Sequence, residues 1–308
     1  MEGSKTRARV ICNPASGGGC EPGAVREALG DLDIEWIDTE GSGDAREAAQ
    51  EWSEGLLIVV GGDGTVNEVV NGLGKAGFPE DVTLAILPMG TGNDLAATLA
   101  VPDRLEEAEE VIRENRVRTL DVARVRSEGV GERFFINVAT GGFGAETSSL
   151  ADEELKGQWG KLAYFRASLE KARDFDVRDV RVILDDVERT MRAVNVAVGN
   201  CRYAGGGWLA APRANPEDGL LDLVIIERVG LKEVLALAPA ALAKSDYLGT
   251  EGVFSARAKK IRVETQPGGL DFTADGELIG DDPVDFEVIP HTLKVVVGPD
   301  YVPEPVGG

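Results

Sequence analysis

Two glycine-rich turns, each placed directly after an apolar run, limit most strongly what this chain can fold into. The run Leu56–Val60 leads into Gly61-Gly62-Asp63-Gly64-Thr65, and the run Leu84–Leu87 leads into Met89–Asp94. A strand that passes through a glycine turn into a helix presents backbone N–H groups and a helix N-terminus to a phosphate. One such turn equally fits an ordinary strand–helix connection, but two at successive strand ends favour phosphate binding.

The first third of the chain alternates apolar strand patterns with helix patterns. The expected strands are Ala8–Cys12, Ile34–Asp38, Leu56–Val60 and Val82–Leu87. The expected helices are Pro22–Leu29, Asp44–Trp52, Val66–Leu73, Asp94–Leu99 and Leu105–Arg113. This alternation predicts an α/β domain with a doubly wound parallel sheet. Ligands of such sheets bind beyond the carboxyl ends of the strands, where Asn13, Thr39, Gly61 and Thr91 fall.

From about residue 120 the pattern changes to strands separated by turn signals, which predicts an all-β antiparallel sandwich. Two expected helices, Ser149–Arg173 and Lys232–Tyr247, interrupt it. We therefore expect an α/β domain over residues 1–120 and a β-sandwich over 121–292. Residues 293–308 form a final strand and tail that can return to the first domain. The expected sandwich strands are Asp121–Arg126, Phe134–Val138, Val180–Leu184, Ala193–Val198, Leu221–Ile226, Lys260–Glu264 and Val284–Val288.

The composition of the 308 residues narrows the function classes. A net charge of −22 argues against a free-standing nucleic-acid binder, which needs a basic stripe. Three cysteines, an odd number, build no disulfide framework and favour a reducing cytoplasm. The single histidine, His291, argues against a Ser-His-Asp catalytic triad and excludes zinc sites with several histidines. Any general acid–base catalysis must therefore come from carboxylates. No apolar run reaches the roughly 18 residues of a membrane span.

Three further segments bring polar side chains into turns. The loop Asn13–Gly19 ends the first strand, and its glycines allow close approach to a ligand. Asp63 either caps the following helix or orients magnesium or a hydroxyl near phosphates. The turn Asp275-Gly276-Glu277 is more simply a hairpin, although a kinase needs such a carboxylate to align or deprotonate an alcohol. The segment Asn215–Asp222 is either a turn or a set of oxygen ligands for a hard cation.

No segment fits the Walker A pattern or opens the first helix with Gly-x-Gly-x-x-Gly. Instead, the set of motifs resembles the diacylglycerol kinase catalytic family, in its bacterial soluble lipid kinase branch, over roughly residues 7–298. The motifs that carry the resemblance are Asn13-Pro14-x-Ser16-Gly17, Gly61-Gly62-Asp63-Gly64-Thr65-x-Asn67-Glu68, Pro88-x-Gly90-Thr91-x-Asn93-Asp94, Asp218-Gly219-x-Leu221-Asp222 and Asp275-Gly276-Glu277.

This resemblance implies a nucleotide-binding first domain, a lipid-substrate β-sandwich and transfer of the γ-phosphoryl group of ATP to a lipid hydroxyl, with Mg²⁺, in the cleft between the domains. The general base would be Glu277, with Asp275 and then Asp63 as further candidates. A structural magnesium would be held by Asn215, Asp218 and the backbone of Leu220, although the neutral Asn215 weakens that site. Nucleotide contacts would be Asn13, Pro14, Ala15, Ser16, Gly17, Thr39, Gly61, Gly62, Asp63, Gly64, Thr65, Val66, Asn67, Thr91, Asn93 and Asp94.

The acceptor is expected to be diacylglycerol or a related lipid alcohol. Two alternatives stay open: a kinase for a soluble acceptor such as NAD, and a catalytically silent nucleotide-binding regulator. Basic and aromatic residues within Ser149–Arg173 fit peripheral contact with anionic lipid, but an ordinary solvated helix explains them more simply. We expect a cytoplasmic protein that visits the inner face of the membrane, binds no nucleic acid and, on base rates of assembly, forms a homodimer.

Overall fold

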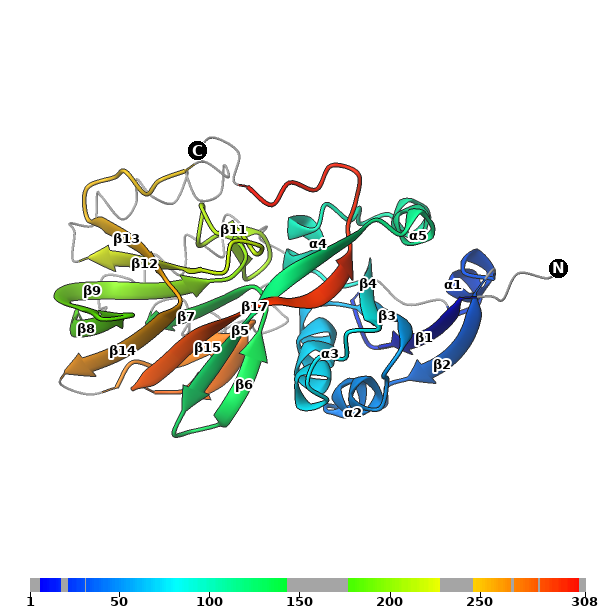
Figure 1. The fold of residues 1–308 in the computed structure, drawn as a ribbon, viewed down its shortest axis with the longest axis horizontal. Coiled ribbons are helices and arrows are strands. Elements are labelled where there is room, and N and C mark those ends of the chain that lie inside the picture. Colours follow the sequence, from blue (N-terminus) through cyan, green and yellow to red (C-terminus); the bar gives the residue numbers. More distant parts are fainter. Residues whose placement is uncertain are drawn as a thin grey trace.

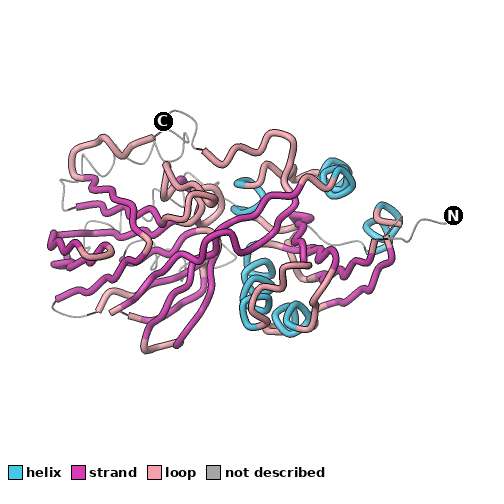
Figure 2. The backbone as a smooth tube through the Cα atoms, viewed as in Figure 1, coloured by secondary structure: helices cyan, strands magenta, loops and turns pink. Residues whose placement is uncertain are grey.

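The computed structural model describes residues 6–17, 22–30, 32–142, 177–227, 246–266, 269–281 and 283–304. An α/β part holds the N-terminal elements, and a β-rich part holds most of the rest (Figure 1). Helices gather around the first part, and strands dominate the second (Figure 2). The predicted fold class, an α/β domain followed by a β-sandwich, is confirmed.

Four parallel strands form the centre of the first part, in the order β4-β3-β1-β2. They are β1 (Arg7–Cys12), β2 (Asp33–Asp38), β3 (Gly55–Gly61) and β4 (Val82–Pro88). Helices α2 (Asp44–Gln50) and α3 (Asp63–Lys75) lie on one face, and α1 (Pro22–Ala28) and α5 (Leu105–Glu114) on the other (Figure 1). A short helix, α4 (Asp94–Thr98), follows β4. Because both faces are covered, nearly every residue of β3 and β4 is buried.

The second part is built from antiparallel pairs. Aromatic rings fill its core: Phe286 packs on Phe135 and Phe272, with ring centroids 6.1 and 5.8 Å apart. Beside it, β10 (Tyr203–Ala204) and β11 (Trp208–Leu209) form a separate hairpin. The larger strands are β7 (Val138–Gly142), β8 (Arg178–Leu184), β9 (Val187–Gly199), β12 (Leu221–Glu227), β13 (Val253–Ala258), β14 (Lys260–Gln266), β15 (Phe272–Ala274) and β16 (Glu277–Gly280).

Two long antiparallel strands, β5 (Val117–Ser127) and β17 (Val284–Val296), run through both parts. The first half of β17 pairs with β14, whereas its last residues pair in parallel with β4. The register shifts between Ile289 and Leu293, where β17 passes from one part to the other. The expected domain boundary after residue 120 falls inside β5, and the division into domains stays a prediction.

Several details differ from the sequence prediction. The strand expected at Val284–Val288 and the separate final strand expected from residue 293 form one continuous strand, β17. Helix α3 begins at Asp63 rather than Val66, so residues of the glycine turn are themselves helical. The expected strand Phe134–Val138 is wrong: β6 (Gly131–Phe135) ends before Ile136, and β7 begins at Val138. The structure also contains β13, which the sequence prediction missed.

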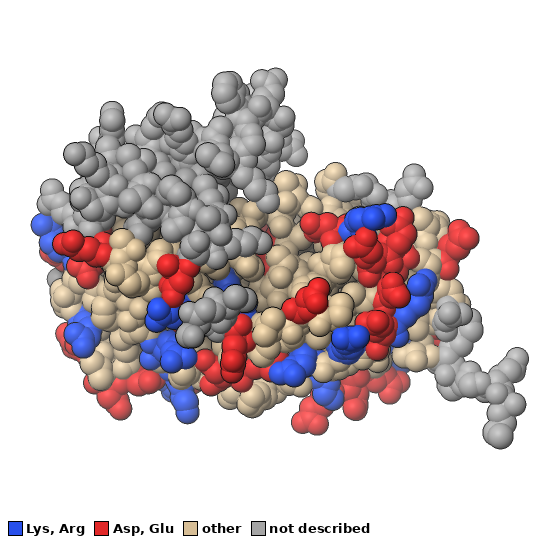
Figure 3. Space-filling model, turned by 90° about the horizontal axis from the view of Figure 1, so that it is seen from above, with Lys and Arg blue, Asp and Glu red and all other residues tan. Residues whose placement is uncertain are grey.

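The two helices expected at Ser149–Arg173 and Lys232–Tyr247 lie outside the described residues, except for the final two positions of the second. Within the described ranges, no helix combines the length and apolar character needed to cross a membrane. Acidic and basic side chains are interspersed on the face shown in Figure 3. Several arginines of the sheet are ion-paired, for example Arg181 with Glu188 at 2.7 Å.

Helices α2 and α3 approach closely at Gly72. A Cβ atom at this position would meet the backbone carbonyl of Arg46 and would lie 2.9 Å from the Cβ of Ala49. We therefore expect Gly72→Ala to lower the free energy of unfolding by about 1–3 kcal/mol, because overpacking outweighs the better helix propensity of alanine. Chemical denaturation measures the change.

Gly23→Ala is the matched control, because nothing lies within 4 Å of the added Cβ in α1. It should be neutral or slightly stabilising. Equal effects of the two substitutions would contradict the close packing of α2 on α3.

Candidate functional site

The site lies where the parallel sheet changes its winding direction. Strand β1 is followed by α1 on one face, and its neighbour β3 is followed by α3 on the other (Figure 1). The two following segments therefore diverge and leave a crevice at the carboxyl ends of the strands. A hydrogen bond bridges it, from Asn13 Nδ2 to Thr65 Oγ1, at 3.1 Å.

The two glycine turns are in direct contact. A Cβ atom on Gly62 would lie 3.0 Å from the Cα atom of Gly90, so larger residues would push the turns apart. The amide of Met89 also donates to the carbonyl of Gly61, at 2.9 Å. Turns that are far apart in the sequence thus form one continuous surface at the N-terminus of α3.

A groove of about 460 Å³ opens along this surface. It brings together the segments after β1 and β2, the start of α3, Gly90 of the second glycine turn and one residue of the second part, Glu277. Its lining side chains include no Lys, Arg or His among the described residues. The lining is Asn13, Ala15, Ser16, Gly17, Thr39, Glu40, Gly41, Ser42, Ala45, Gly62, Gly64, Thr65, Glu68, Gly90 and Glu277.

Two carboxylates, Asp63 and Asp94, lie behind the glycine turns. Asp63 Oδ1 accepts the backbone N–H of Asp94 at 2.7 Å, so Asp63 is not the helix cap. Asp94 is buried, and its carboxylate accepts the N–H groups of Gly206 and Gly207 at 3.0 and 2.6 Å. Burial, and then the charge of Asp94, raise the pKa of Asp63 to about 6. The charge of Asp63 in turn contributes to the raised pKa of Asp275.

The Asp275 carboxylate is bound on several sides. It accepts the N–H groups of Ile136 and Asn137 at 2.9 Å and of Val138 at 3.2 Å. These bonds explain the break between β6 and β7, because the three amides point to a carboxylate instead of a neighbouring strand. Asn67 of α3 lies 3.5 Å from the same carboxylate. Burial raises the pKa of Asp275 to about 6 despite these hydrogen bonds.

The turn that carries Asp275 exposes Glu277 to the groove. Asp275 and Gly276 both have positive φ, and they connect β15 to β16 as a hairpin. The hairpin interpretation of the sequence is therefore confirmed. In this turn the Asp275 carboxylate is held by backbone N–H groups, whereas the Glu277 side chain is exposed along the groove wall.

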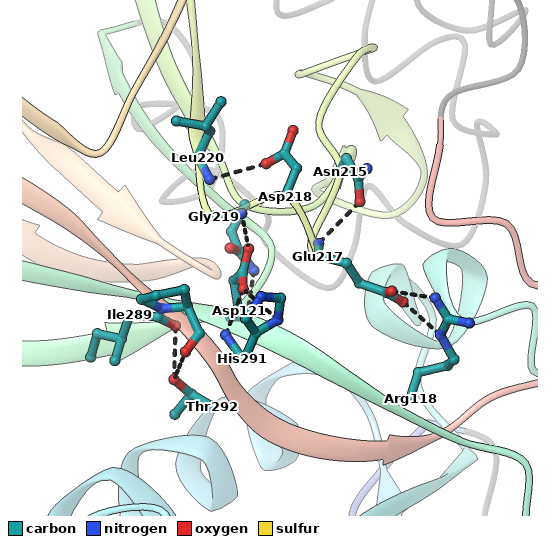
Figure 4. A network of polar contacts seen from close by, with 12 residues as sticks. Arg118, Asp121, Asn215, Glu217, Asp218, Gly219, Leu220, Ile289, His291 and Thr292 are labelled. Carbon is teal, nitrogen blue, oxygen red and sulfur yellow. Dashed lines mark hydrogen bonds and ion pairs between the residues drawn. The ribbon is translucent and has the colours of Figure 1, made fainter.

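The segment predicted to hold a structural metal forms a compact turn (Figure 4). Asn215 Oδ1 accepts the N–H of Glu217, and Asp218 Oδ1 accepts that of Leu220, both at 3.0 Å. Asp218 Oδ2 lies 3.4 Å from the guanidinium of Arg257. Each of these oxygens therefore has a hydrogen-bond or ion-pair partner within the protein. This ligand assignment stays a prediction from the resemblance.

The predicted nucleotide residues divide into two groups. Those that line the groove are Asn13, Ala15, Ser16, Gly17, Thr39, Gly62, Gly64 and Thr65. Of the others, Val66 is buried in the core, Asn67 faces Asp275, and the Thr91 hydroxyl lies 3.5 Å from the Cβ position of Gly17. Sequence reasoning missed Gly90 and Glu68, although both belong to the quoted motifs, and it missed Glu40–Ser42 and Ala45, which carry no motif.

Comparison with known proteins identifies the family. The family model described as the diacylglycerol kinase catalytic domain matches residues 7–125, and the YegS C-terminal NAD kinase beta sandwich-like domain matches residues 137–297. The chain belongs to the YegS-like, diacylglycerol kinase-like family of lipid kinases. Proteins named probable lipid kinase YegS-like, from Yersinia pestis (strain Pestoides F) and Yersinia pseudotuberculosis serotype O:1b (strain IP 31758), are 30% identical over 261 residues, which cover 84% of this chain and 85% of each relative.

Solved structures agree with this family. A putative diacylglycerol kinase from Bacillus anthracis str. Sterne has a TM-score of 0.81 at 29% identity and covers 98% of this chain and 99% of its own. A second structure with that description and source has a TM-score of 0.79 at 27% identity, with coverage of 97% and 100%. The predicted family, a lipid kinase of this type, is confirmed.

The raised pKa of Asp63 predicts a stability effect. Its folded-state pKa of about 6 exceeds the ordinary value of 3.8, so the native state binds the proton more tightly and the ionised carboxylate costs stability at neutral pH. Asp63→Asn keeps an oxygen that accepts the N–H of Asp94. We expect it to raise the free energy of unfolding by about 1–2 kcal/mol at pH 7.5, a gain that shrinks toward pH 4.

Denaturation of both proteins across this pH range measures the difference. The control is Asp185→Asn, an exposed carboxylate in the turn between β8 and β9 that also accepts backbone N–H groups, from Lys259 and Lys260. It should give no gain. A variant at Asp63 that is less stable than the wild type at pH 7.5 would contradict the assigned cost of the buried charge.

Proposed function

We propose that this chain transfers the γ-phosphoryl group of ATP to the hydroxyl of diacylglycerol or a related lipid alcohol, in the groove between the glycine turns and Glu277. The observation that carries the proposal is the convergence in one groove of the segments after β1, β2, β3 and β4 with a carboxylate from the second part. The lipid kinase names of the relatives support the acceptor class.

The phosphates would be held mainly by backbone. The described lining of the groove has no basic side chain, so N–H groups of the turns and the N-terminus of α3 supply the local positive potential. Magnesium fits here, because Mg²⁺ commonly binds through one or two carboxylates together with substrate phosphates, and Asp63 lies directly behind the turns. When bound, Mg²⁺ would neutralise charge on the phosphate oxygens.

Glu277 would align and deprotonate the acceptor hydroxyl. It is exposed in the groove, whereas the Asp275 carboxylate is occupied by three backbone N–H groups. A base must reach the proton that it removes, so geometry favours Glu277. Asp275 then acts by holding the turn, and Asp63 acts on the phosphate side.

The direct test is transfer of labelled γ-phosphate from ATP to diacylglycerol, phosphatidylglycerol and a sphingoid base in mixed micelles, with NAD as a soluble acceptor. A labelled lipid supports the proposal and identifies the acceptor. Label on NAD alone would show a kinase for soluble acceptors. Nucleotide binding without transfer to any of these would favour the regulator.

We expect Glu277→Gln to lower kcat by roughly 10²–10⁴-fold, because the amide cannot accept the hydroxyl proton. The dissociation constant of MgATP should change less than about threefold, because Glu277 lies on the acceptor side of the groove. Steady-state transfer rates and calorimetric titration with MgATP measure the two quantities.

Glu251→Gln is the matched control, because Glu251 is exposed in the turn before β13 and lines no part of the groove. It should keep the wild-type rate. A Glu277→Gln enzyme that also keeps the wild-type rate would move the role of the base to another carboxylate.

A further inference from the structure

One contact between the two parts runs through two carboxylates, Asp63 and Asp94, and a glycine turn that lies behind the groove. The carboxylate of Asp63, at the start of α3, accepts the backbone N–H of Asp94. The carboxylate of Asp94 accepts the backbone N–H groups of Gly206 and Gly207, which lie in the turn between β10 and β11. This contact therefore connects the nucleotide-side helix to a turn of the second part.

The geometry of this contact requires small residues. Gly205, Gly206 and Gly207 all have positive φ, which lets consecutive N–H groups point at one carboxylate. A Cβ atom on Gly92 would run into Asp63 Oδ2 and would lie 3.3 Å from the Cα atom of Gly206. The three segments thus meet at van der Waals distance, with both carboxylates between them.

Asp94 is the centre of this contact. It is buried, it does not line the groove, and both of its oxygens accept N–H groups of the second part. Hydrogen bonds to an ionised acceptor are stronger and shorter than neutral ones, so this carboxylate is a firm anchor. A nucleotide ligand would be expected to face the groove instead.

We propose that Asp94 is a positioning residue that fixes Asp63 and the β10–β11 glycine turn against each other, and so sets the distance between the phosphate side and the acceptor side of the groove. This inference rests on the proposed function. It assigns to Asp94 a role that differs from direct nucleotide contact, and it gives the Gly205–Gly207 turn a part in the same site.

The test is Asp94→Asn. The amide keeps one acceptor oxygen but turns an N–H₂ group toward a backbone N–H, so one of the two bonds is lost. We expect kcat to fall about 10²-fold, because small misplacements of reacting groups cost this much, while the dissociation constant of MgATP changes less than about threefold. In parallel, hydrogen–deuterium exchange of the peptide 203–209 should become faster in the variant.

Two further variants make the result specific. Gly92→Ala leaves the charge of Asp94 intact, but its added methyl group would push Asp63 and Gly206 apart. It should reproduce the loss of kcat. Asp185→Asn is the matched control: this carboxylate also accepts two backbone N–H groups, from Lys259 and Lys260, but lies at the β8–β9 turn. It should retain kcat and leave exchange in 203–209 unchanged.

Three outcomes would overturn the proposal. They are a tenfold weaker MgATP affinity with unchanged kcat in Asp94→Asn, unchanged kcat together with unchanged affinity, and unchanged exchange in 203–209. Failure of the proposed function is distinguishable, because wild-type protein that transfers no phosphate to any acceptor would still report the contact through the exchange measurement.

Discussion

The pairing of β5 with β17 is the constraint on which the rest of the structure depends. Both strands run through the parallel sheet and the sandwich, and they remain paired from Val117–Val296 to Arg126–Asp285 with one shift of register. Since a paired strand is stiff along its length, the two parts are held in a fixed relation rather than joined by a flexible linker. That relation places the β15–β16 hairpin opposite the N-terminus of α3. The groove, and the position of Glu277 in it, follow from this arrangement.

Buried carboxylates then link the two parts at the site itself. Asp94 binds the β10–β11 turn, and Asp275 binds the segment between β6 and β7 and faces Asn67. The raised pKa of Asp63 and of Asp275, each to about 6, shows that these charges are held at a cost. Buried ionisable groups that lower the stability of the fold are common at functional sites, where they are kept in place for chemistry.

Local patterns in the sequence predicted much of this. Strand β3 and the turn after it could be predicted because an apolar run is followed directly by glycines. The hairpin at Asp275–Glu277 could be predicted because Asp-Gly is a turn signal. The break between β6 and β7 was not readable: Phe134–Val138 has the pattern of one strand, and the carboxylate that interrupts it comes from Asp275, far along the chain. The same limit applies to Asp94, because its partners Gly206 and Gly207 lie 112 and 113 residues away. Non-local hydrogen bonds leave no mark in a single sequence.

In the proposed complex, the phosphates of the nucleotide lie on the paired glycine turns, and Glu277 forms the acceptor side of the groove. A crystal structure of the protein with Mg²⁺ and a non-hydrolysable ATP analogue tests it most directly. We expect the triphosphate within hydrogen-bond distance of backbone N–H groups of residues 61–65 and 13–17, with its terminal phosphate toward Glu277. A nucleotide bound elsewhere on the molecule, or a groove that stays empty at saturating analogue, would contradict it.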